Sequence, residues 1–181
     1  MSRRDEVLQA AIELLDEVGL DDLTTRRLAA RLGVQPGALY RHFTSKQALL
    51  DAIVEQLVTL EPPPPATQEG WAEQVSATAT VARAGMLAHR DGARLVATMG
   101  APGPSARAGF ERLVAVIAAG GAPAEAAMLA TDTVFAYVNG FTIEEQARKV
   151  TGPSAVPRSE RDRQFAAGLG LIIDGIRAAL R

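Results

Sequence analysis

The sequence predicts an all-α protein, and three observations support this prediction. Apolar residues recur at intervals of three and four along most of the 181 residues, the spacing that places them on one face of a helix. No segment shows the strict alternation of apolar and polar residues that a half-buried strand needs. The composition, with 48% hydrophobic and 22% charged residues, is typical of a globular chain that can bury a core.

The first 60 residues predict four helices. Their ends carry the usual signals, with Gly19 and Gly33 as stops, Thr24 or Thr25 and Ser45 as caps, and Pro36 in a first turn. Each helix has an apolar face, as expected for helices that pack on a common core. These faces comprise Val7, Ala11, Leu14, Leu15 and Val18; Leu28, Ala29 and Leu32; Leu39, Tyr40 and Phe43; and Leu49, Ile53, Leu57 and Leu60.

A proline-rich segment, EPPPPATQEG at 61–70, follows these helices. Four consecutive prolines cannot continue a helix, and they act as a stiff spacer. We therefore predict a domain at 1–60 and a second domain at 61–181; a loop inside one domain is the alternative interpretation. The second part predicts only helices, at about 71–87, 92–99, around Phe110 up to Gly120, at 123–150, and from Phe165 to Leu180.

The stretch TTRRLAARLGVQPGALYRHFTSK, residues 24–46, predicts a helix-turn-helix, because two short helices meet at a glycine turn behind a bracing helix. In such units the second helix enters the major groove of DNA. Residues 24–50 contain no acid, whereas residues 1–23 contain seven, in a chain of net charge −2. This asymmetry favours a DNA-binding surface over a merely solvated helix face, which is the alternative for Arg26, Arg27 and Arg31.

Side-chain chemistry suggests roles within this stretch. Arg26 can grip guanine O6 and N7, Gln35 can read adenine, and Ala38 can meet a thymine methyl. Phosphate contacts are expected from Thr25, Arg41 and Lys46, and Gly37 lets the backbone come close. Two alternatives stay open: Tyr40 could be a core residue, and His42 could face solvent.

The segment LLDEVGLDDLTTRRLAARLGVQPGALYRHFTSKQALLDAI, residues 14–53, resembles the DNA-binding domain of the tetracycline-repressor family. Its most specific parts are LTTRRLAARLGV, LYRHF and ALLDA. Farther along, HRDGARLV at 89–96 and GFTIEEQA at 140–147 are similar to segments of the core domain of the tetracycline repressors. The resemblance implies a homodimeric, all-helical transcriptional repressor that binds a palindromic operator in double-stranded DNA. A small-molecule effector in the core domain would shift the spacing of the DNA-binding domains and release the DNA.

The resemblance also implies which residues touch the operator. The matching positions are Thr25, Arg26, Gln35, Gly37, Ala38, Tyr40, His42 and Lys46. Arg41 stands where the tetracycline repressor has Trp, and Pro36-Gly37-Ala38 replaces Gln-Pro-Thr. We therefore expect the same docking on DNA but a different sequence preference.

The resemblance is weaker at the effector site. The tetracycline repressors bind the drug with magnesium through a His that corresponds to Val96, and through an Asn and a Phe that correspond to Thr78 and Ala82. Glu144 alone matches a residue of that site. We therefore predict an apolar effector that binds without a metal ion or cofactor. Candidate lining residues are Met86, Met99, Phe110, Phe135 and Glu144, with Trp71, Tyr137 and Phe141 as further apolar candidates. Plain core packing is the alternative for the apolar ones.

The two C-terminal helices resemble the family's dimerisation helices. Gly168, Gly170 and Gly175 lie inside the last one, where each glycine costs roughly 1 kcal/mol against alanine. Close approach of another helix would compensate this cost, so we expect a two-fold interface there. The alternative is that both helices fill the core of a monomer.

Other functions have little support in the sequence. Without cysteine, a glycine-rich phosphate loop or a spaced metal-ligand cluster, an enzyme is not predicted. The adjacent Glu144 and Glu145 would face different directions on a helix. A helical ligand- or protein-binding module without DNA-binding activity remains the alternative function. No apolar run approaches the ~18 residues of a membrane span, and the lack of cysteine suits a cytoplasmic location.

Overall fold

The computed structural model describes residues 2–58, 70–151 and 156–179, with the side chains of 149–151 excluded. Residues 61–69 of the proline-rich segment, the predicted boundary at 60/61, Leu60 and Leu180 lie outside this part. The described residues form helices and no strand, which confirms the predicted all-α class. The helices are α1 (Arg3–Val18), α2 (Thr25–Arg31), α3 (Pro36–Leu39), α4 (Lys46–Leu57), α5 (Trp71–Leu87), α6 (Gly92–Ala97), α7 (Pro104–Ala119), α8 (Ala124–Thr151) and α9 (Arg158–Ala179).

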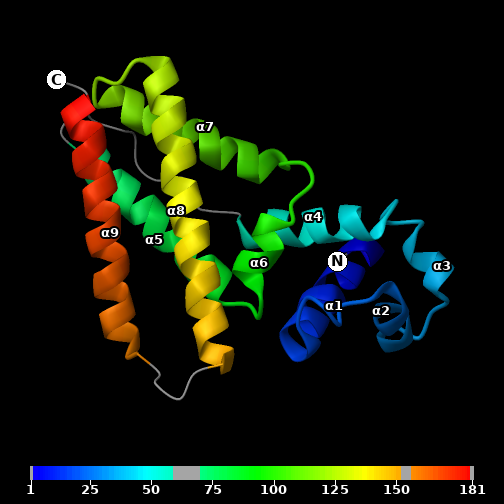
Figure 1. The fold of residues 1–181 in the computed structure, drawn as a ribbon. Coiled ribbons are helices and arrows are strands. Elements are labelled where there is room, and N and C mark those ends of the chain that lie inside the picture. Colours follow the sequence, from blue (N-terminus) through cyan, green and yellow to red (C-terminus); the bar gives the residue numbers. More distant parts are fainter. Residues whose placement is uncertain (1, 59–69, 152–155, 180–181) are drawn as a thin grey trace.

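The N-terminal helices α1–α4 form a small unit at one end of the molecule (Figure 1). Its helix ends follow the signals in the sequence. The Thr24 hydroxyl accepts a hydrogen bond from the Arg27 N–H, and the Ser45 hydroxyl accepts one from the Ala48 N–H. Gly33 adopts a φ of +65°, as predicted for the turn between α2 and α3. The core of this unit joins Leu15, Leu23, Leu28, Leu39, Phe43, Leu49 and Ile53.

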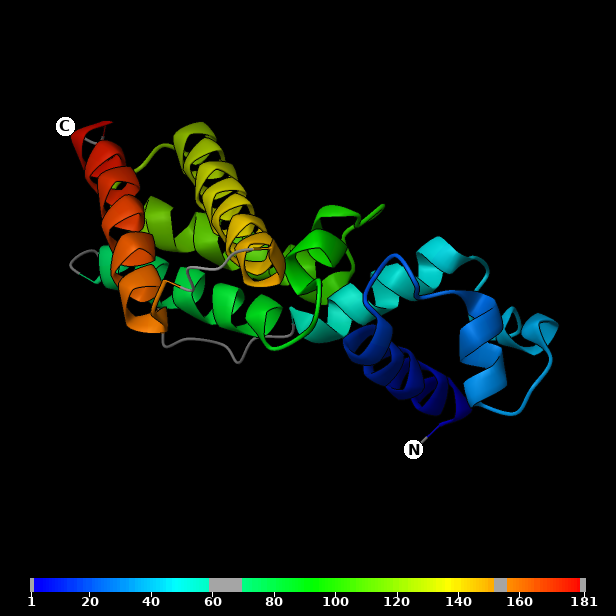
Figure 2. The same ribbon diagram turned by 60° about the horizontal axis from the view of Figure 1, so that its bottom comes forward.

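The remaining helices form a larger bundle in which α8 and α9 run side by side, with α9 at the edge away from α1–α4 (Figures 1 and 2). Helix α8 also packs against α5, α6 and α7. The core of this bundle includes Val75, Leu113, Ile117, Val134, Phe165 and Leu169. None of the helices in residues 2–58, 70–151 and 156–179 has an apolar stretch long enough to cross a bilayer.

Helix α6 joins the two units. Its Leu95 is buried in the core of α1–α4, whereas its Ala93 is buried in the core of the larger bundle. The end of α1 is tied to the turn before α6, since the Asp16 carboxylate accepts a hydrogen bond from the Arg90 N–H at 2.9 Å. Asp91 accepts another from the Leu20 N–H at 2.9 Å. The two-domain division therefore stays a prediction, with α6 shared between two cores.

Candidate DNA-binding surface and effector cavity

The segment from the start of α2 to the start of α4 presents most of the predicted DNA contacts at the surface. Arg26, Gln35, Gly37, Tyr40, Arg41 and Lys46 are exposed, while Thr25, Ala38 and His42 are half-buried. Thr24 is the N-cap of α2, so Thr25 is the first residue of that helix. Ser45 is the N-cap of α4, so Lys46 is its first residue. A side chain built at Gly37 would meet nothing within 4 Å, so the backbone is open to a neighbouring molecule there.

The helix α3 is shorter than the sequence suggests, because it ends at Leu39 and the chain continues as a turn. Tyr40 and Phe43 therefore lie outside the helix proper. Tyr40 is 51% exposed, so it does not belong to the core, whereas Phe43 is buried. An exposed aromatic ring with a polar tip beside a basic surface is available to a partner.

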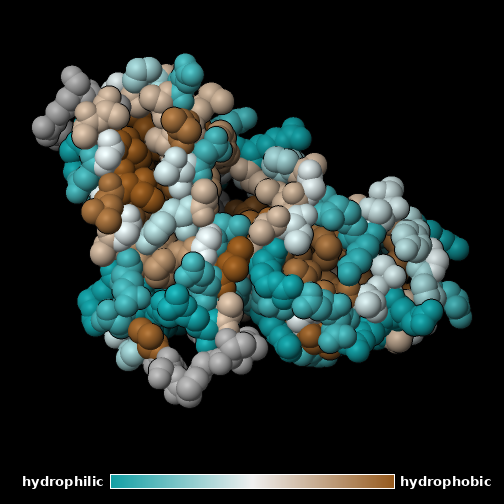
Figure 3. Space-filling model, in the orientation of Figure 1, coloured by the Kyte–Doolittle hydropathy of each residue, from teal (hydrophilic) through white to brown (hydrophobic). Residues whose placement is uncertain are grey.

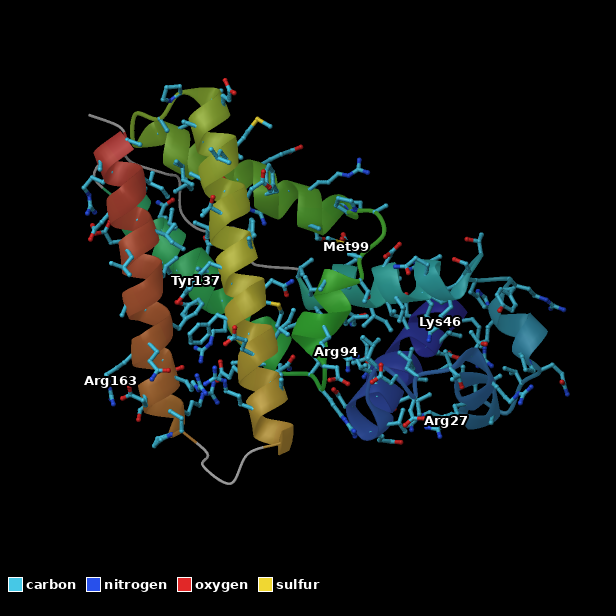
Figure 4. All side chains as sticks on the ribbon, in the orientation of Figure 1. Arg27, Lys46, Arg94, Met99, Tyr137 and Arg163 are labelled. Carbon is cyan, nitrogen blue, oxygen red and sulfur yellow. The ribbon has the colours of Figure 1, made fainter. Side chains whose placement is uncertain are left out.

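The structure divides the five basic side chains of residues 24–46 into two groups. Arg31 pairs with Glu13 at 3.1 Å and Glu17 at 2.7 Å, two acids of α1, and Arg27 pairs with Asp22 at 3.2 Å. The hydrogen bonds to Glu17 and Glu13 raise the pKa of Arg31. Arg26, Arg41 and Lys46 form no ion pair with any residue that the structure describes. Their charges are thus available to an external anion; Figure 4 labels Arg27 and Lys46 as one member of each group.

A cavity of about 500 Å³ lies in the larger bundle, where α4, α5, α6, α7 and α8 meet. Its opening is visible as a hollow between α8, α7 and α6 in Figure 3. The lining is mostly apolar and includes Leu57, Val58, Ala82, Met86, Val96, Met99, Pro102, Ala106, Phe110, Phe135 and Val138. Cavities of this volume and character hold drug-sized ligands.

Four of the five predicted ligand residues line this cavity, namely Met86, Met99, Phe110 and Phe135. Phe110 and Phe135 stack with ring centroids 6.4 Å apart. Glu144 lies elsewhere on α8, where its side chain is 70% exposed and pairs with Arg148 at 3.2 Å. Ala82 and Val96, which replace a Phe and a His of the tetracycline repressors, do line the cavity.

Phe141, another of the aromatic candidates, belongs to a buried charge cluster and does not line the cavity. Arg83 pairs with Glu145 at 2.9 Å, and both side chains are about 5% exposed. Arg83 also pairs with Asp162 at 2.7 Å and lies over the rings of Phe141 and Phe165. This cluster joins α5, α8 and α9. The sequence did not predict this cluster, because nothing in the segment ATVARAGML shows that its one arginine, Arg83, points inward.

Trp71 and Tyr137 likewise serve packing. The Trp71 ring lies under the Arg177 guanidinium at 5.8 Å, and the Tyr137 hydroxyl donates to the Phe165 carbonyl at 3.0 Å. Burial raises the pKa of Tyr137, and the nearby Arg83 charge partly opposes this. Neither residue lines the cavity.

Two polar residues near the cavity were not predicted from the sequence. Asn139 lines it, and its side-chain oxygen is buried without a hydrogen-bond partner in the described residues. Glu55 of α4 accepts hydrogen bonds from the backbone N–H groups of Ser105 and Ala106 at the start of α7. Asn139 lies one helical turn after Phe135, so helical spacing from that candidate places Asn139 on the same face of α8. Glu55 gives no such signal, because its partners are 50 residues away.

No group of three or more His, Asp or Glu side chains that could hold a metal ion occurs in the described part of the chain. Glu144 and Glu145 do face different directions, as the helical geometry requires, since one is exposed and the other is buried.

Comparison with known proteins agrees with this architecture. Residues 7–53 match the model of bacterial regulatory proteins of the tetR family, and residues 63–158 match the model of the tetracycline repressor-like C-terminal domain. The chain is 34% identical to the class A tetracycline repressor of Escherichia coli over 94% of this chain and 88% of that protein. This chain belongs to the tetR family of bacterial regulatory proteins. A class C relative from Escherichia coli is 46% identical over 51% of this chain, but the match spans only 43% of that relative.

Solved structures of family members superpose along nearly the whole chain. BioQ with its double-stranded DNA operator has a TM-score of 0.82 at 36% identity, covering 98% of this chain and 99% of that one. A TetR variant from Acinetobacter baumannii in complex with minocycline has a TM-score of 0.84 at 33% identity, covering 100% and 99%. The family resemblance seen in the sequence is therefore confirmed for both parts of the fold.

Proposed function

We propose that this chain is a ligand-responsive repressor that binds a palindromic operator as a homodimer and leaves it when a small molecule occupies the cavity. The observation that carries the proposal is the division of positive charge on α2–α4. Arg27 and Arg31 are neutralised by neighbouring acids, whereas Arg26, Arg41 and Lys46 face outward without ion-pair partners in the described residues. A cation that faces outward without an internal partner can neutralise a DNA phosphate and release its condensed counterion.

The proposed docking places α2 and α3 against the major groove. Arg26 and Gln35 would read base edges, and Ala38 would contact a thymine methyl. The remaining residues would bind phosphates or support the backbone approach, namely Thr25, Gly37, Tyr40, Arg41, His42 and Lys46. The fold similarity to BioQ in its operator complex supports this docking. Action on DNA implies a regulatory and not a catalytic role, in the cytoplasm.

Surface residues on α8 and α9 support the homodimer. Leu171 is 77% exposed and Leu129 is 68% exposed, and both are large apolar side chains on long helices. Side chains built at Gly140, Gly170 and Gly175 would meet nothing within 4 Å, so these glycines are open to another helix. Gly168 differs, because it packs closely on Tyr137 of the same chain. Figure 3 shows hydrophobic side chains reaching the surface over α8 and α9.

The position of the cavity supports the proposed response to a ligand. Leu57 and Val58, at the end of α4, line it together with residues of α5–α8. Because α4 also carries Lys46 and packs on α1, an occupant of the cavity contacts the helix that positions the DNA-binding unit. The ligand releases DNA only if it binds the DNA-incompetent state more tightly. The effector is proposed to be apolar and to bind without metal, since Ala82 and Val96 supply no metal-binding atoms.

The test begins with a selection of genomic DNA fragments that the full-length protein binds. The affinity of the wild type and of matched variants for the enriched site is then measured. We expect a palindrome whose half-sites lie about 34–36 Å apart. Arg26→Ala should lose about 1–3 kcal/mol of binding free energy and relax base preference. Arg31→Ala, which removes an internally paired arginine of the same helix, is the control. A protein that binds small molecules but enriches no DNA site would instead be a ligand-binding module.

A further inference from the structure

We propose that Arg4, at the start of α1, is a further DNA contact and binds a backbone phosphate of the operator beside the turn between α3 and α4. The inference rests on the proposed function, because it adds a residue to the surface that binds DNA. It starts from one contact between distant parts of the sequence: the guanidinium carbon of Arg4 lies 5.0 Å from the centre of the Phe43 ring.

The contact with Phe43 fixes where the charge of Arg4 lies. Phe43 is buried, and its N–H donates to the Leu39 carbonyl at 3.0 Å, so the ring is anchored at the end of α3. Phe43 stands between Arg41 and Lys46 in the sequence. Because successive α-carbons are about 3.8 Å apart, the backbone of both residues lies within roughly 11 Å of Phe43. Arg4 therefore adds a cation to the surface that already carries Arg41 and Lys46.

The direction of α1 places Arg4 on the side of the unit that is free to meet DNA. The end of α1 faces the larger bundle, since Asp16 accepts a hydrogen bond from the Arg90 N–H at 2.9 Å. The helix starts on the opposite side, away from the larger bundle, as α2 and α3 also lie (Figure 2). Arg4 is exposed there, so a DNA strand can approach its guanidinium.

The charge of Arg4 is available, in contrast to that of its neighbour. Arg3 pairs with Glu6 at 2.7 Å, one helical turn farther along α1. Arg4 forms no ion pair within residues 2–58, 70–151 and 156–179. The next carboxylate, that of Asp5, accepts a hydrogen bond from the Ser2 N–H at 2.9 Å and serves as part of the helix cap. Arg4 can thus neutralise a phosphate and release its condensed counterion.

The chemistry and position of Arg4 indicate a phosphate and not a base as its target. A guanidinium can donate two parallel hydrogen bonds to the oxygens of one phosphate. The Phe43 ring attracts the cation and restricts its side chain, so less conformational freedom is lost on binding. Base edges are read inside the groove by the recognition helix, whereas neighbouring elements contact the DNA backbone. Arg4 belongs to α1, so it helps to set the docking position without reading sequence.

The experiment measures the salt dependence of binding to the selected operator by fluorescence anisotropy, with full-length wild type, Arg4→Ala and Arg3→Ala. Arg3→Ala is the matched control, because it removes the same charge one residue away. A phosphate contact contributes about 0.9 to the slope of log affinity against log salt, so Arg4→Ala should flatten the slope by about that amount per subunit. The affinity advantage of the wild type should then shrink about three- to fourfold per subunit between roughly 50 and 200 mM salt. Arg3→Ala should keep the wild-type slope.

Two further measurements test that the target is a phosphate. Arg4→Lys keeps the charge, so it should keep the wild-type slope. Arg4→Ala should weaken binding to the operator and to an unrelated duplex by similar factors, because a phosphate contact carries no base preference. Thermal melting of each variant establishes that it is folded.

The outcomes separate this inference from the proposed function. If the wild type binds the operator but Arg4→Ala has the wild-type slope, or Arg3→Ala flattens the slope as much, the inference is overturned and the proposed function stands. A loss in Arg4→Ala that is confined to the operator sequence also overturns it, because Arg4 would then read bases. If the wild type binds no DNA, the proposed function fails and the inference fails with it.

Discussion

Glu55 connects the helix that carries Lys46 to the helix that forms one wall of the cavity. Its carboxylate accepts hydrogen bonds from the Ser105 N–H at 2.5 Å and the Ala106 N–H at 3.4 Å, at the start of α7. The cap residue of α7 is Gly103, which has no side chain to serve those groups. Glu55 therefore caps α7 from another helix, and we expect Glu55→Ala to weaken both α7 and its connection to α4.

The size of the effect follows from this geometry. Loss of a capping side chain costs about 0.5–2 kcal/mol, and loss of a carboxylate at a helix N-terminus costs about 0.3–1 kcal/mol. Since the two describe overlapping interactions, Glu55→Ala should lower the free energy of unfolding by about 1–2 kcal/mol. In a chain of this length that corresponds to a fall in melting temperature of roughly 2–8 °C.

The same interaction predicts a pH dependence. Burial alone would raise the pKa of Glu55, but hydrogen bonds from Ser105 and Ala106 outweigh burial and hold the pKa below 4.5. A carboxyl group with a depressed folded pKa stabilises the protein above its unfolded pKa, and this stabilisation is lost as pH falls through the folded value. The difference in stability between wild type and Glu55→Gln should therefore be constant near neutrality and shrink as pH falls below about 4.5.

A second substitution separates capping from connection. A side chain at Gly103 would collide with the Glu55 carboxylate in the wild type, but Glu55→Ala removes that obstacle. Gly103→Ser should therefore destabilise the wild type and stabilise Glu55→Ala, because serine supplies a local cap. The double variant should regain thermal stability, measured by circular dichroism, but release operator less completely at saturating effector. If Gly103→Ser has the same effect in both backgrounds, or Glu55→Ala melts as the wild type does, the reasoning is refuted.

Three further predictions follow from the buried charges, the surface of α9 and the cavity. Arg83→Met should lower the free energy of unfolding by about 3–5 kcal/mol, and with it the urea midpoint, because Glu145 stays buried without its partner. Combining Arg83→Met with Glu145→Leu should recover most of this loss. An unchanged urea midpoint for the single variant would contradict the prediction. Leu171→Asp should convert a dimer into folded monomers, measured by sedimentation at micromolar concentration. Val81→Asp, which changes another exposed apolar residue, on α5, should leave the dimer intact. A monomeric wild type would disprove the interface. Tetracycline should not release the operator with or without magnesium, because Val96 lacks the imidazole nitrogen that holds the metal; magnesium-dependent release would show that the proposed metal-free site is wrong.

Local signals in the sequence predicted most of the fold. Caps and stops such as Thr24, Gly33 and Ser45 act within one helical turn, so they can be identified without knowing the tertiary structure. The short length of α3 was not predicted, because the apolar spacing of Leu39 and Phe43 suits a helix or a pair of turns. The surface of α9 shows a similar limit, because the apolar spacing does not distinguish Leu171, which faces outward, from Ile172, which packs against its own chain's core.

The candidate sites were predictable only in part. Residue type and spacing identified Arg26 and Lys46 as exposed cations, but only the three-dimensional structure shows that Arg31 is neutralised by Glu13 and Glu17. Similarly, large apolar residues could be named as candidate lining, yet sequence does not distinguish a cavity wall from plain core. The contacts of Arg83 and Glu55 join residues 50 or more positions apart, so no local pattern reports them.

The salt dependence of operator binding tests the central claim most directly, namely that Arg26, Arg41 and Lys46 supply the positive charge that binds DNA. Fluorescence anisotropy with the selected operator gives the slope of log affinity against log salt for the wild type, Lys46→Ala and Arg31→Ala. Each phosphate contact contributes about 0.9 to that slope per subunit, so Lys46→Ala should flatten it by about one unit for each subunit bound. Arg31→Ala should leave it unchanged. Equal slopes for the wild type and Lys46→Ala, or a loss in Arg31→Ala as large as that in Lys46→Ala, would contradict the account.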